Sequence, residues 1–364
     1  MDYQQENNVW VIGHKNPDTD SICAAICYSN LKNRLQDGFH YIPKRAGSIN
    51  EETKYVLQHF GVEPPEYAED AGAQVKDIAF RRTAGVSGHI SLKKAWELMK
   101  TENVMTLAVT SASDKLEGLI ITGDIAESYM DVYDNHILSR ARTQYKNIVE
   151  TLNGTLLAGN EHAYFLRGKV VVATGSRDVI EECIESDDLV IVGDRDETHI
   201  CALEENASCM VVTGGTQVSA QVLEMANRRD CVVIITPYDT FTAARLINQS
   251  MPIKYFMKKE NFVTFDIDDY VDEVREVMSK KRHRDFPVLD DQRRYLGMVS
   301  RRNLLNMHKK KLILVDHNEK SQAIDGIEGA EILEIIDHHR LGSLETMSPV
   351  FFRNQPLGCT STIV

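Results

Sequence analysis

The chain has 364 residues, of which 43% are hydrophobic and 26% charged, a composition typical of globular domains. A formal net charge of −13 argues against a nucleic-acid backbone as the main ligand, because proteins that bind it are usually basic. No apolar run approaches the roughly 18 residues of a membrane span, and the polar start MDYQQENN lacks the order of a signal peptide. Seven scattered cysteines without a CxxC pair predict reduced thiols. We therefore expect a cytoplasmic protein of about two to four domains.

Residues 9–25, VWVIGHKNPDTDSICAA, begin with an apolar run that predicts a buried strand. The run ends in a loop that carries one imidazole and two carboxylates, at His14, Asp18 and Asp20. Asp20 or Ser21 is the expected N-cap of the helix that follows. Because imidazole and carboxylate ligands suit Mn, Co, Zn, Fe or Mg, the loop predicts a metal site. The alternative is a capped strand-to-helix turn with incidental polar residues.

Two later stretches repeat this pattern of an apolar run that ends in Asp-His. Residues 311–319 read KLILVDHNE, and residues 330–340 read AEILEIIDHHR. Parallel strands place their carboxyl ends along one edge of a sheet, where sites form. We therefore expect the polar residues of all three stretches to converge at one edge. They are His14, Asp18, Asp20, Asp316, His317, Asp337, His338 and His339.

Four motifs in these stretches and near residue 360 resemble the DHH phosphoesterase superfamily and, within it, the family II inorganic pyrophosphatases. They are GHKNPDTDS at 13–21, DHN at 316–318, DHH at 337–339 and GCTST at 358–362. The residues PDTD in the first motif and DHN in the second are similar to those of the pyrophosphatases. Relatives that cut polyphosphate or oligonucleotides usually differ there. The resemblance implies a catalytic domain built on a parallel sheet.

The first and second motifs lie so far apart that a large region must be inserted between them. This insert contains an internal repeat with a constant offset of 179 residues. The helix-like stretch that ends at Met99 recurs at Met278, and GLIITGDI from Gly118 recurs as GMVSRRNL from Gly297. Such a gapless match indicates a duplicated module. The repeat resembles the CBS domain, which works in pairs and usually binds adenine nucleotides.

The CBS resemblance implies nucleotide contacts on both copies. The candidates are Lys100, Thr122, Asp124, Arg284, Ser300 and Asn303. Ser300 and Asn303 keep the family's hydroxyl and ribose positions, whereas Ile121 replaces the hydroxyl in the first copy. Lys100 and Arg284 are the candidates for the nucleotide phosphate. The alternative for the polar residues that precede a helix is capping alone.

Four apolar runs alternate with helical stretches between the repeats, at 170–173, 189–192, 210–212 and 232–235. This alternation predicts a small parallel α/β domain. Its loops VGDRDE and VTGGT resemble the DRTGG domain. The expected fold class is therefore α/β, a parallel-sheet DHH catalytic domain interrupted by a CBS pair that flanks the DRTGG-like domain. The expected boundaries are 1–65 and 309–364 for the catalytic domain, 66–130 and 249–308 for the CBS copies, and 131–248 for the DRTGG-like domain.

The pyrophosphatase resemblance implies two divalent metals, Mn²⁺ or Co²⁺, with Mg²⁺ joining alongside the substrate. It places His14 and Asp18 on one metal and Asp20 and His338 on the other, with Asp316 between them. It further implies hydrolysis of pyrophosphate to two phosphates.

The same resemblance assigns catalytic roles to His339, His317 and Asp337. His339 would contact the substrate phosphate, Asp337 would orient a histidine, and His317 and Asn318 would support the site. At the CBS pair the regulatory ligands would be AMP, ADP, ATP or a diadenosine polyphosphate, and the expected assembly is a homodimer through the CBS domains.

The chain ends at Val364, where the family continues into a C-terminal DHHA2 domain with a further Asp ligand and phosphate-binding basic residues. The sequence is therefore expected to be truncated and poorly active. Two alternatives remain open: a non-catalytic fragment that senses adenine nucleotides, and a DHH phosphodiesterase that acts on polyphosphate or short oligonucleotides.

Overall fold

The computed structural model describes residues 7–130, 134–175, 177–307 and 309–364. It divides into two compact units, one formed by residues up to 81, 265–288 and 298–364, and one formed by residues 82–264 and 289–297. The predicted boundaries at residues 131 and 308 lie outside the described residues. Within the described ranges, no helix has the length and apolar character needed to cross a membrane.

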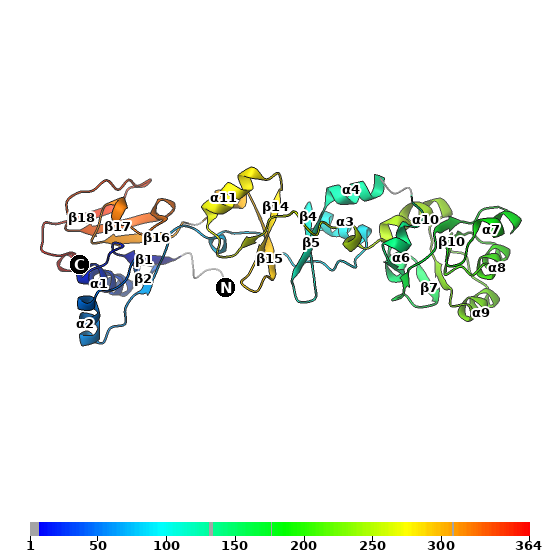
Figure 1. Cartoon of the computed structure of the whole chain (residues 1–364), viewed down its shortest axis with the longest axis horizontal. Helices are drawn as coiled ribbons and strands as arrows, with labels where there is room; N and C mark the ends of the chain where they lie inside the picture. Colours follow the sequence, from blue (N-terminus) through cyan, green and yellow to red (C-terminus); the bar gives the residue numbers. More distant parts are fainter. Residues whose placement is uncertain (1–6, 131–133, 176, 308) are drawn as a thin grey trace. The chain divides into compact units, whose positions relative to one another are not determined.

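A six-stranded parallel sheet forms the centre of the first unit, in the order β18-β17-β16-β1-β2-β3. Its strands are β1 (Asn8–Ile12), β2 (His40–Arg45), β3 (Glu66–Tyr67), β16 (Lys311–Val315), β17 (Glu331–Asp337) and β18 (Phe351–Asn354). Strands from the two ends of the chain thus pair directly, and Figure 1 shows blue β1 beside orange β16. The expected parallel α/β architecture is confirmed for this part of the chain.

Helices α1 (Thr19–Leu35) and α2 (Glu51–Phe60) belong to the same unit. Because side chains alternate along a strand, β1 contributes to two cores. Val9 and Val11 pack with Ala24 and Ala25 of α1, and Ile12 packs in the second core, on the other face. This burial fixes where the loop after β1 leaves the sheet.

The first turn of α1 begins earlier than predicted. Asp18 is the N-cap, and its side chain accepts a hydrogen bond from the Ser21 backbone N–H at 2.9 Å. The prediction of Asp20 or Ser21 as the cap was wrong, because Asp18 has the extended backbone and the oxygen that a cap needs. Gly13 is required here, since a Cβ at this position would lie 1.8 Å from Ser21 Oγ.

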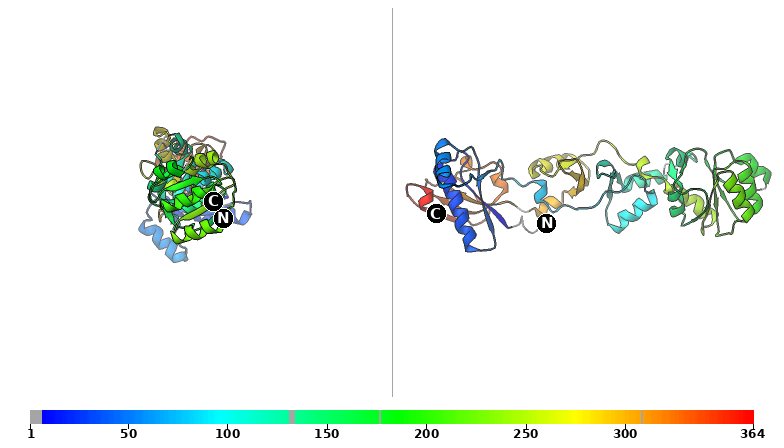
Figure 2. Two further views of the ribbon diagram at one scale, coloured as in Figure 1. Left: turned by 90° about the vertical axis from the view of Figure 1, so that its right-hand side faces the viewer. Right: turned by 90° about the horizontal axis from the view of Figure 1, so that it is seen from below.

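The second unit contains a five-stranded sheet in the order β7-β12-β11-β10-β9. Its strands are β7 (Thr155–Ala158), β9 (Val170–Val172), β10 (Leu189–Val192), β11 (Cys209–Val212) and β12 (Val232–Ile235), and its main helices are α6 (Tyr145–Thr151), α7 (Arg177–Cys183), α8 (Asp196–Glu204), α9 (Ala220–Arg228) and α10 (Thr240–Leu246). Helices α7 to α9 cover one face, and α6 and α10 cover the other (Figures 1 and 2). The four predicted strands are confirmed, and antiparallel β7 is an addition.

The repeat is confirmed as structure. In the first copy, α3 (Leu92–Thr101), β4 (Thr106–Thr110) and β5 (Leu116–Ile121) follow one another. In the second copy, α11 (Val271–Lys280), β14 (Asp285–Leu289) and β15 (Tyr295–Ser300) each begin 179 residues after their counterparts. The copies differ after the last strand, where α4 (Thr122–Met130) corresponds to a single 3₁₀ turn over Asn303–Asn306.

The remaining short elements are β6 (Thr143–Gln144), β8 (Tyr164–Phe165), β13 (Phe265–Asp266) and α5 (Ile137–Arg140). Buried residues of the first repeat copy, such as Met99 and Ile120, belong to the same apolar core as Ile148 of α6 and Ile191 of β10. One core of the second unit therefore joins the first copy to the face of the five-stranded sheet that α6 and α10 cover, and a second core lies under α7 to α9.

Candidate metal centre

Three neighbouring strands of the first unit, β1, β16 and β17, end in the predicted motifs. Because all three run parallel, their following loops meet at one edge of the sheet. Two groups of possible ligands lie there, His14, Asp18 and Asp316 in one and Asp316, His338 and His339 in the other, each with its ligand atoms within 4.8 Å of one another. The expected convergence is thus observed for these five residues, whereas Asp20 belongs to neither group.

Asp316 lies at the centre of this cluster and is shared by both groups. Its Oδ2 lies 3.5 Å from His14 Nε2, and its Oδ1 lies 3.5 Å from His338 Nε2. The side chain is 1% exposed, and the backbone has a left-handed φ of 65°, which is uncommon for a residue with a Cβ. A buried carboxylate between two imidazoles can serve two cations at once.

Hydrogen bonds fix which ring nitrogen of two histidines carries the proton. Nδ1 of His338 lies 2.9 Å from the Leu357 carbonyl oxygen, and Nδ1 of His317 lies 2.9 Å from that of Val315. A carbonyl only accepts, so both Nδ1 atoms donate and each Nε2 keeps its lone pair. Nε2 of buried His317 has no hydrogen-bond partner among the described residues. Such an orphaned polar atom fits a site completed by a ligand.

Asp337 ties the DHN and DHH motifs together. Its Oδ1 accepts hydrogen bonds from the backbone N–H groups of His338 and His339 at 2.8 and 3.1 Å, and His339 Nδ1 lies 2.8 Å away. Asn318 Nδ2 donates to the other oxygen of Asp337. Asp337 therefore orients His339, whose ring remains about half exposed at the edge.

Asp20 is held by a turn that the sequence did not connect to it. Its carboxylate accepts from the backbone N–H of Thr360 at 2.6 Å and from the N–H and Oγ of Ser361 at 2.8 and 2.5 Å. Thr360 Oγ1 also donates to Asp316 Oδ1 at 2.9 Å. Asp20 Oδ2 lies 3.9 Å from His338 Nε2. The sequence contains the GCTST motif at this turn, but the motif alone does not predict that its residues contact Asp20.

The electrostatics of the cluster favour bound cations. Burial raises the pKa of Asp316 despite its hydrogen bonds to His14 and Thr360. The hydrogen bond with Asp316 raises the pKa of His14. Burial opposes ionisation of Asp20, but hydrogen bonds from Ser361 and Thr360 outweigh it and lower its pKa. A divalent cation would offset the carboxylate charge that burial penalises, so the donor set fits one.

The predicted nucleotide-binding residues lie on the two repeat copies, three on each. In the first copy Asp124 accepts from the Ile121 backbone N–H at 2.9 Å and lies 3.3 Å from Lys258 Nζ. In the second, Asn303 accepts from the N–H and Oγ of Ser300 at 2.8 and 2.7 Å. The two copies thus repeat one hydrogen bond, from a backbone N–H to the side chain three residues later.

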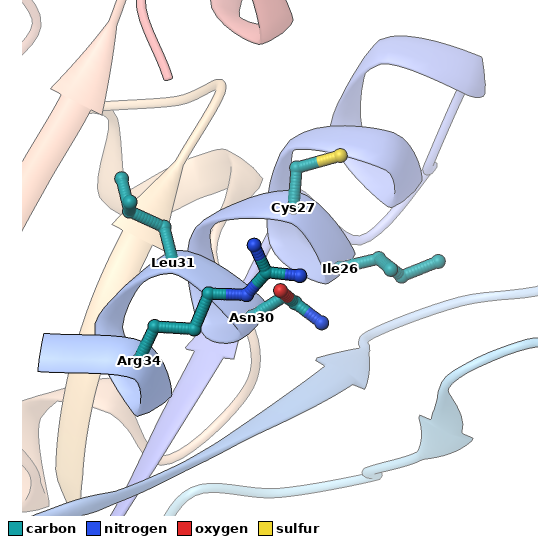
Figure 3. Close-up of a pocket in the computed structure, with 5 residues that line it drawn as sticks. All are labelled: Ile26, Cys27, Asn30, Leu31 and Arg34. Atoms are coloured by element: carbon teal, nitrogen blue, oxygen red, sulfur yellow. The ribbon is translucent and has the colours of Figure 1, made fainter. Parts of the chain in front are cut away.

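The other three candidates take different positions. Thr122 begins α4, Lys100 Nζ lies 5.7 Å from the centre of the Trp96 ring, and the Arg284 side chain is exposed. Figure 3 shows a shallow pocket on α1, and none of the predicted site residues lines it. Its lining residues are Ile26, Cys27, Asn30, Leu31 and Arg34.

Comparisons with known proteins place the two inserted modules. The model of the DRTGG domain matches residues 147–250, and that of the CBS domain matches residues 253–309. A solved structure of the CBS and DRTGG domains of the regulatory region of Clostridium perfringens pyrophosphatase, complexed with the activator diadenosine tetraphosphate, is 36% identical. It matches 63% of this chain and 100% of that chain, with a TM-score of 0.61.

Two curated proteins match nearly the whole chain. A cobalt-dependent inorganic pyrophosphatase of Clostridium perfringens is 42% identical over 356 residues, and a probable manganese-dependent inorganic pyrophosphatase of Thermotoga maritima is 39% identical over 356 residues. Each alignment covers 98% of this chain and 65% of the relative. The chain therefore spans just under two thirds of the length of these relatives.

Proposed function

Because the chain belongs to the family II inorganic pyrophosphatases that carry CBS and DRTGG domains, we propose that it takes part in the hydrolysis of pyrophosphate to two phosphates. The single observation that carries this proposal is the position of buried Asp316 between His14 and His338. A carboxylate in that position belongs to two ligand sets at once.

The residues of the cluster divide into two ligand sets in this proposal. His14 and Asp18 hold one divalent ion, Asp20 and His338 hold the other, and Asp316 belongs to both. Cobalt or manganese suits this imidazole and carboxylate set and is named for the relatives. When bound, the two ions lower the pKa of a water and neutralise phosphate charge, with magnesium accompanying the substrate.

His339, His317 and Asp337 complete the proposed site. His339 contacts a phosphate of the substrate, and support for this role comes from its half-exposed ring at the sheet edge. Asp337 holds that ring in one orientation through the 2.8 Å contact to Nδ1. His317 can accept a hydrogen bond at Nε2, which has no partner among the described residues. Asn318 supports the site by donating a hydrogen bond to Asp337.

Adenine nucleotides regulate the reaction in this proposal. They bind at the CBS pair, with Lys100, Thr122 and Asp124 on the first copy and Arg284, Ser300 and Asn303 on the second. The support is the relative whose regulatory region was solved with diadenosine tetraphosphate. AMP, ADP, ATP and diadenosine polyphosphates share the adenosine and phosphate groups that such residues would recognise. We further propose the predicted domain boundaries, a homodimer through the CBS domains and a cytoplasmic location.

A phosphate-release assay with Mn²⁺ or Co²⁺, run with and without AMP, tests the proposal. Slow, metal-dependent phosphate release that changes with AMP is the expected result, in line with the prediction of a poorly active chain. Release from polyphosphate or oligonucleotides but not from pyrophosphate would instead support the phosphodiesterase alternative. Binding of AMP by calorimetry without hydrolysis of any of these substrates would support the nucleotide sensor.

A further inference from the structure

The side chains around Asp316 differ in what holds them in place. Asp18 is held within its own loop, by the hydrogen bond from the Ser21 N–H, and His14 lies in the same loop, 4.0 Å from Asp18. Asp20 and His338 are held instead by a segment that follows β18. The cluster therefore has two halves. His14 and Asp18 lie together in one loop, whereas Asp20 and His338 are held by a segment that is distant in the sequence from Asp20.

This segment comprises residues 355–361 and contacts both members of the second half. The Leu357 carbonyl accepts from His338 Nδ1 at 2.9 Å. The backbone N–H groups of Thr360 and Ser361 donate to the two oxygens of Asp20. A carboxylate with both oxygens bound has one side-chain orientation, so the segment decides where Asp20 points.

The two hydroxyl groups of the segment add the contacts that side chains control. Ser361 Oγ donates to Asp20 Oδ1 at 2.5 Å, and Thr360 Oγ1 donates to Asp316 Oδ1 at 2.9 Å. That oxygen of Asp316 faces His338, whereas the other faces His14. The hydroxyl contacts therefore lie on one side of the shared carboxylate.

The turn that carries these hydroxyls is anchored in the protein core. Thr360 is fully buried, and Ile363 packs in the same apolar cluster as Ala24 and Ala25 of α1. Water cannot replace the Thr360 hydroxyl where no solvent reaches it. Removing this group would leave Asp316 without the donor on that side.

We propose that Thr360 and Ser361 are positioning residues that assemble the half of the metal centre with Asp20 and His338 and leave the half with His14 and Asp18 intact. This inference rests on the proposed function only in taking the cluster to hold two divalent ions. Loss of one hydroxyl should weaken one ion about 10- to 100-fold, the usual effect of removing a partner of a metal ligand. The affinity for the other ion should fall less, because Ser361 contacts neither His14 nor Asp18, and Thr360 contacts Asp316 on the oxygen that faces His338.

Equilibrium dialysis against Mn²⁺, combined with electron paramagnetic resonance, tests the assignment on the whole chain. The wild type should bind two ions with the coupled spectrum of a pair. Thr360→Val and Ser361→Ala should each keep one tight ion with the six-line spectrum of an isolated Mn²⁺. Thr360→Ser, which keeps the hydroxyl, should retain both ions. Thr362→Val is the matched control, because Thr362 lies in the same turn and its Oγ1 lies 2.9 Å from Cys359 Sγ, away from the cluster's ligands.

Two strongly bound ions in both Thr360→Val and Ser361→Ala would overturn the proposal, as would loss of both ions together or a wild type that binds fewer than two. If Thr360→Val does not fold, Ser361→Ala decides, since that side chain is exposed and the backbone N–H bonds to Asp20 remain. A wild type that binds two ions and releases no phosphate would contradict the proposed function alone.

Discussion

Asp316 is the residue on which the proposed centre depends most. Asp316→Asn keeps the shape of the side chain and removes its charge, so both ion sites lose the shared ligand and we expect both ions to be lost or strongly weakened. Elemental analysis after dialysis measures this directly. Asp325→Asn is the control for net charge, because Asp325 is exposed and lies 4.0 Å from Lys15. Two ions retained by Asp316→Asn would remove Asp316 from the bridging role.

The sequence predicted the residues of this cluster better than their partners. The motifs at the strand ends locate His14, Asp316 and His338, because apolar runs predict the strands and parallel strands bring their carboxyl ends to one edge of the sheet. The bonds from Thr360 and Ser361 to Asp20 join residues 340 and 341 positions apart. Such a contact follows from how a turn packs after β18, and neither spacing nor residue type specifies it. The cap at Asp18 was missed because each of the four successive residues 18–21 carries a side-chain oxygen that could cap the helix.

At the scale of elements, the repeated hydrogen bond gives a prediction on stability. Asp124 accepts the Ile121 N–H just as Asn303 accepts the Ser300 N–H. Asp124→Ala should therefore lower the free energy of unfolding by about 1 kcal/mol, the usual net contribution of one hydrogen bond. Asp124→Asn keeps the accepting oxygen and should cost less than half as much. Urea denaturation measures both, and equal losses in the two variants would contradict the contribution of this hydrogen bond.

The five-stranded sheet of the second unit gives a prediction on thiol chemistry. Burial raises the pKa of Cys231 to about 12, and it raises the pKa of fully buried Cys209 as well. The thiolate is the reactive form, so at pH 8 neither residue should react with iodoacetamide while the sheet is folded. Exposed Cys27 and Cys183 provide the comparison. Mass spectrometry of labelled peptides measures the rates, and labelling of Cys231 as fast as Cys27 would contradict the buried sheet.

Sequence periodicity predicted these elements well where the apolar pattern was strong. The 179-residue offset recovered both repeat copies because α3 and α11 have the same burial pattern. Strand β7 was missed because its four residues alternate in exposure and carry no long apolar run. Helix α8 begins at Asp196, inside the stretch VGDRDE that the sequence indicates as a loop. Both departures concern short elements whose limits depend on tertiary packing, which local sequence does not reveal.

At the scale of the whole chain, Lys310 links the residues before the second motif to the six-stranded sheet. Its Nζ donates to the Gly72 carbonyl at 2.8 Å and lies 5.0 Å from the centre of the Trp10 ring. Burial lowers its pKa. Lys310→Met keeps the length of the side chain but loses the hydrogen bond and the cation, so it should destabilise the protein by about 1 kcal/mol and shift Trp10 emission.

Fluorescence in a Trp96→Phe background isolates Trp10, since the chain has two tryptophans. Lys309→Met serves as the matched control, because this neighbouring side chain is exposed. Equal urea midpoints and equal Trp10 spectra in the two variants would show that Lys310 makes no specific contact.

The order of strands has a consequence for synthesis of the protein on the ribosome. Strand β1 lies between β2 and β16, and about 300 residues separate it from β16 in the chain. At ordinary rates of translation, β1 therefore waits roughly 15 to 60 s for its second neighbour. Residues 82–264, most of the other compact unit, emerge in that interval. We expect residues 82–264 to fold first, while the six-stranded sheet of the first unit has an open edge that can associate with other nascent chains.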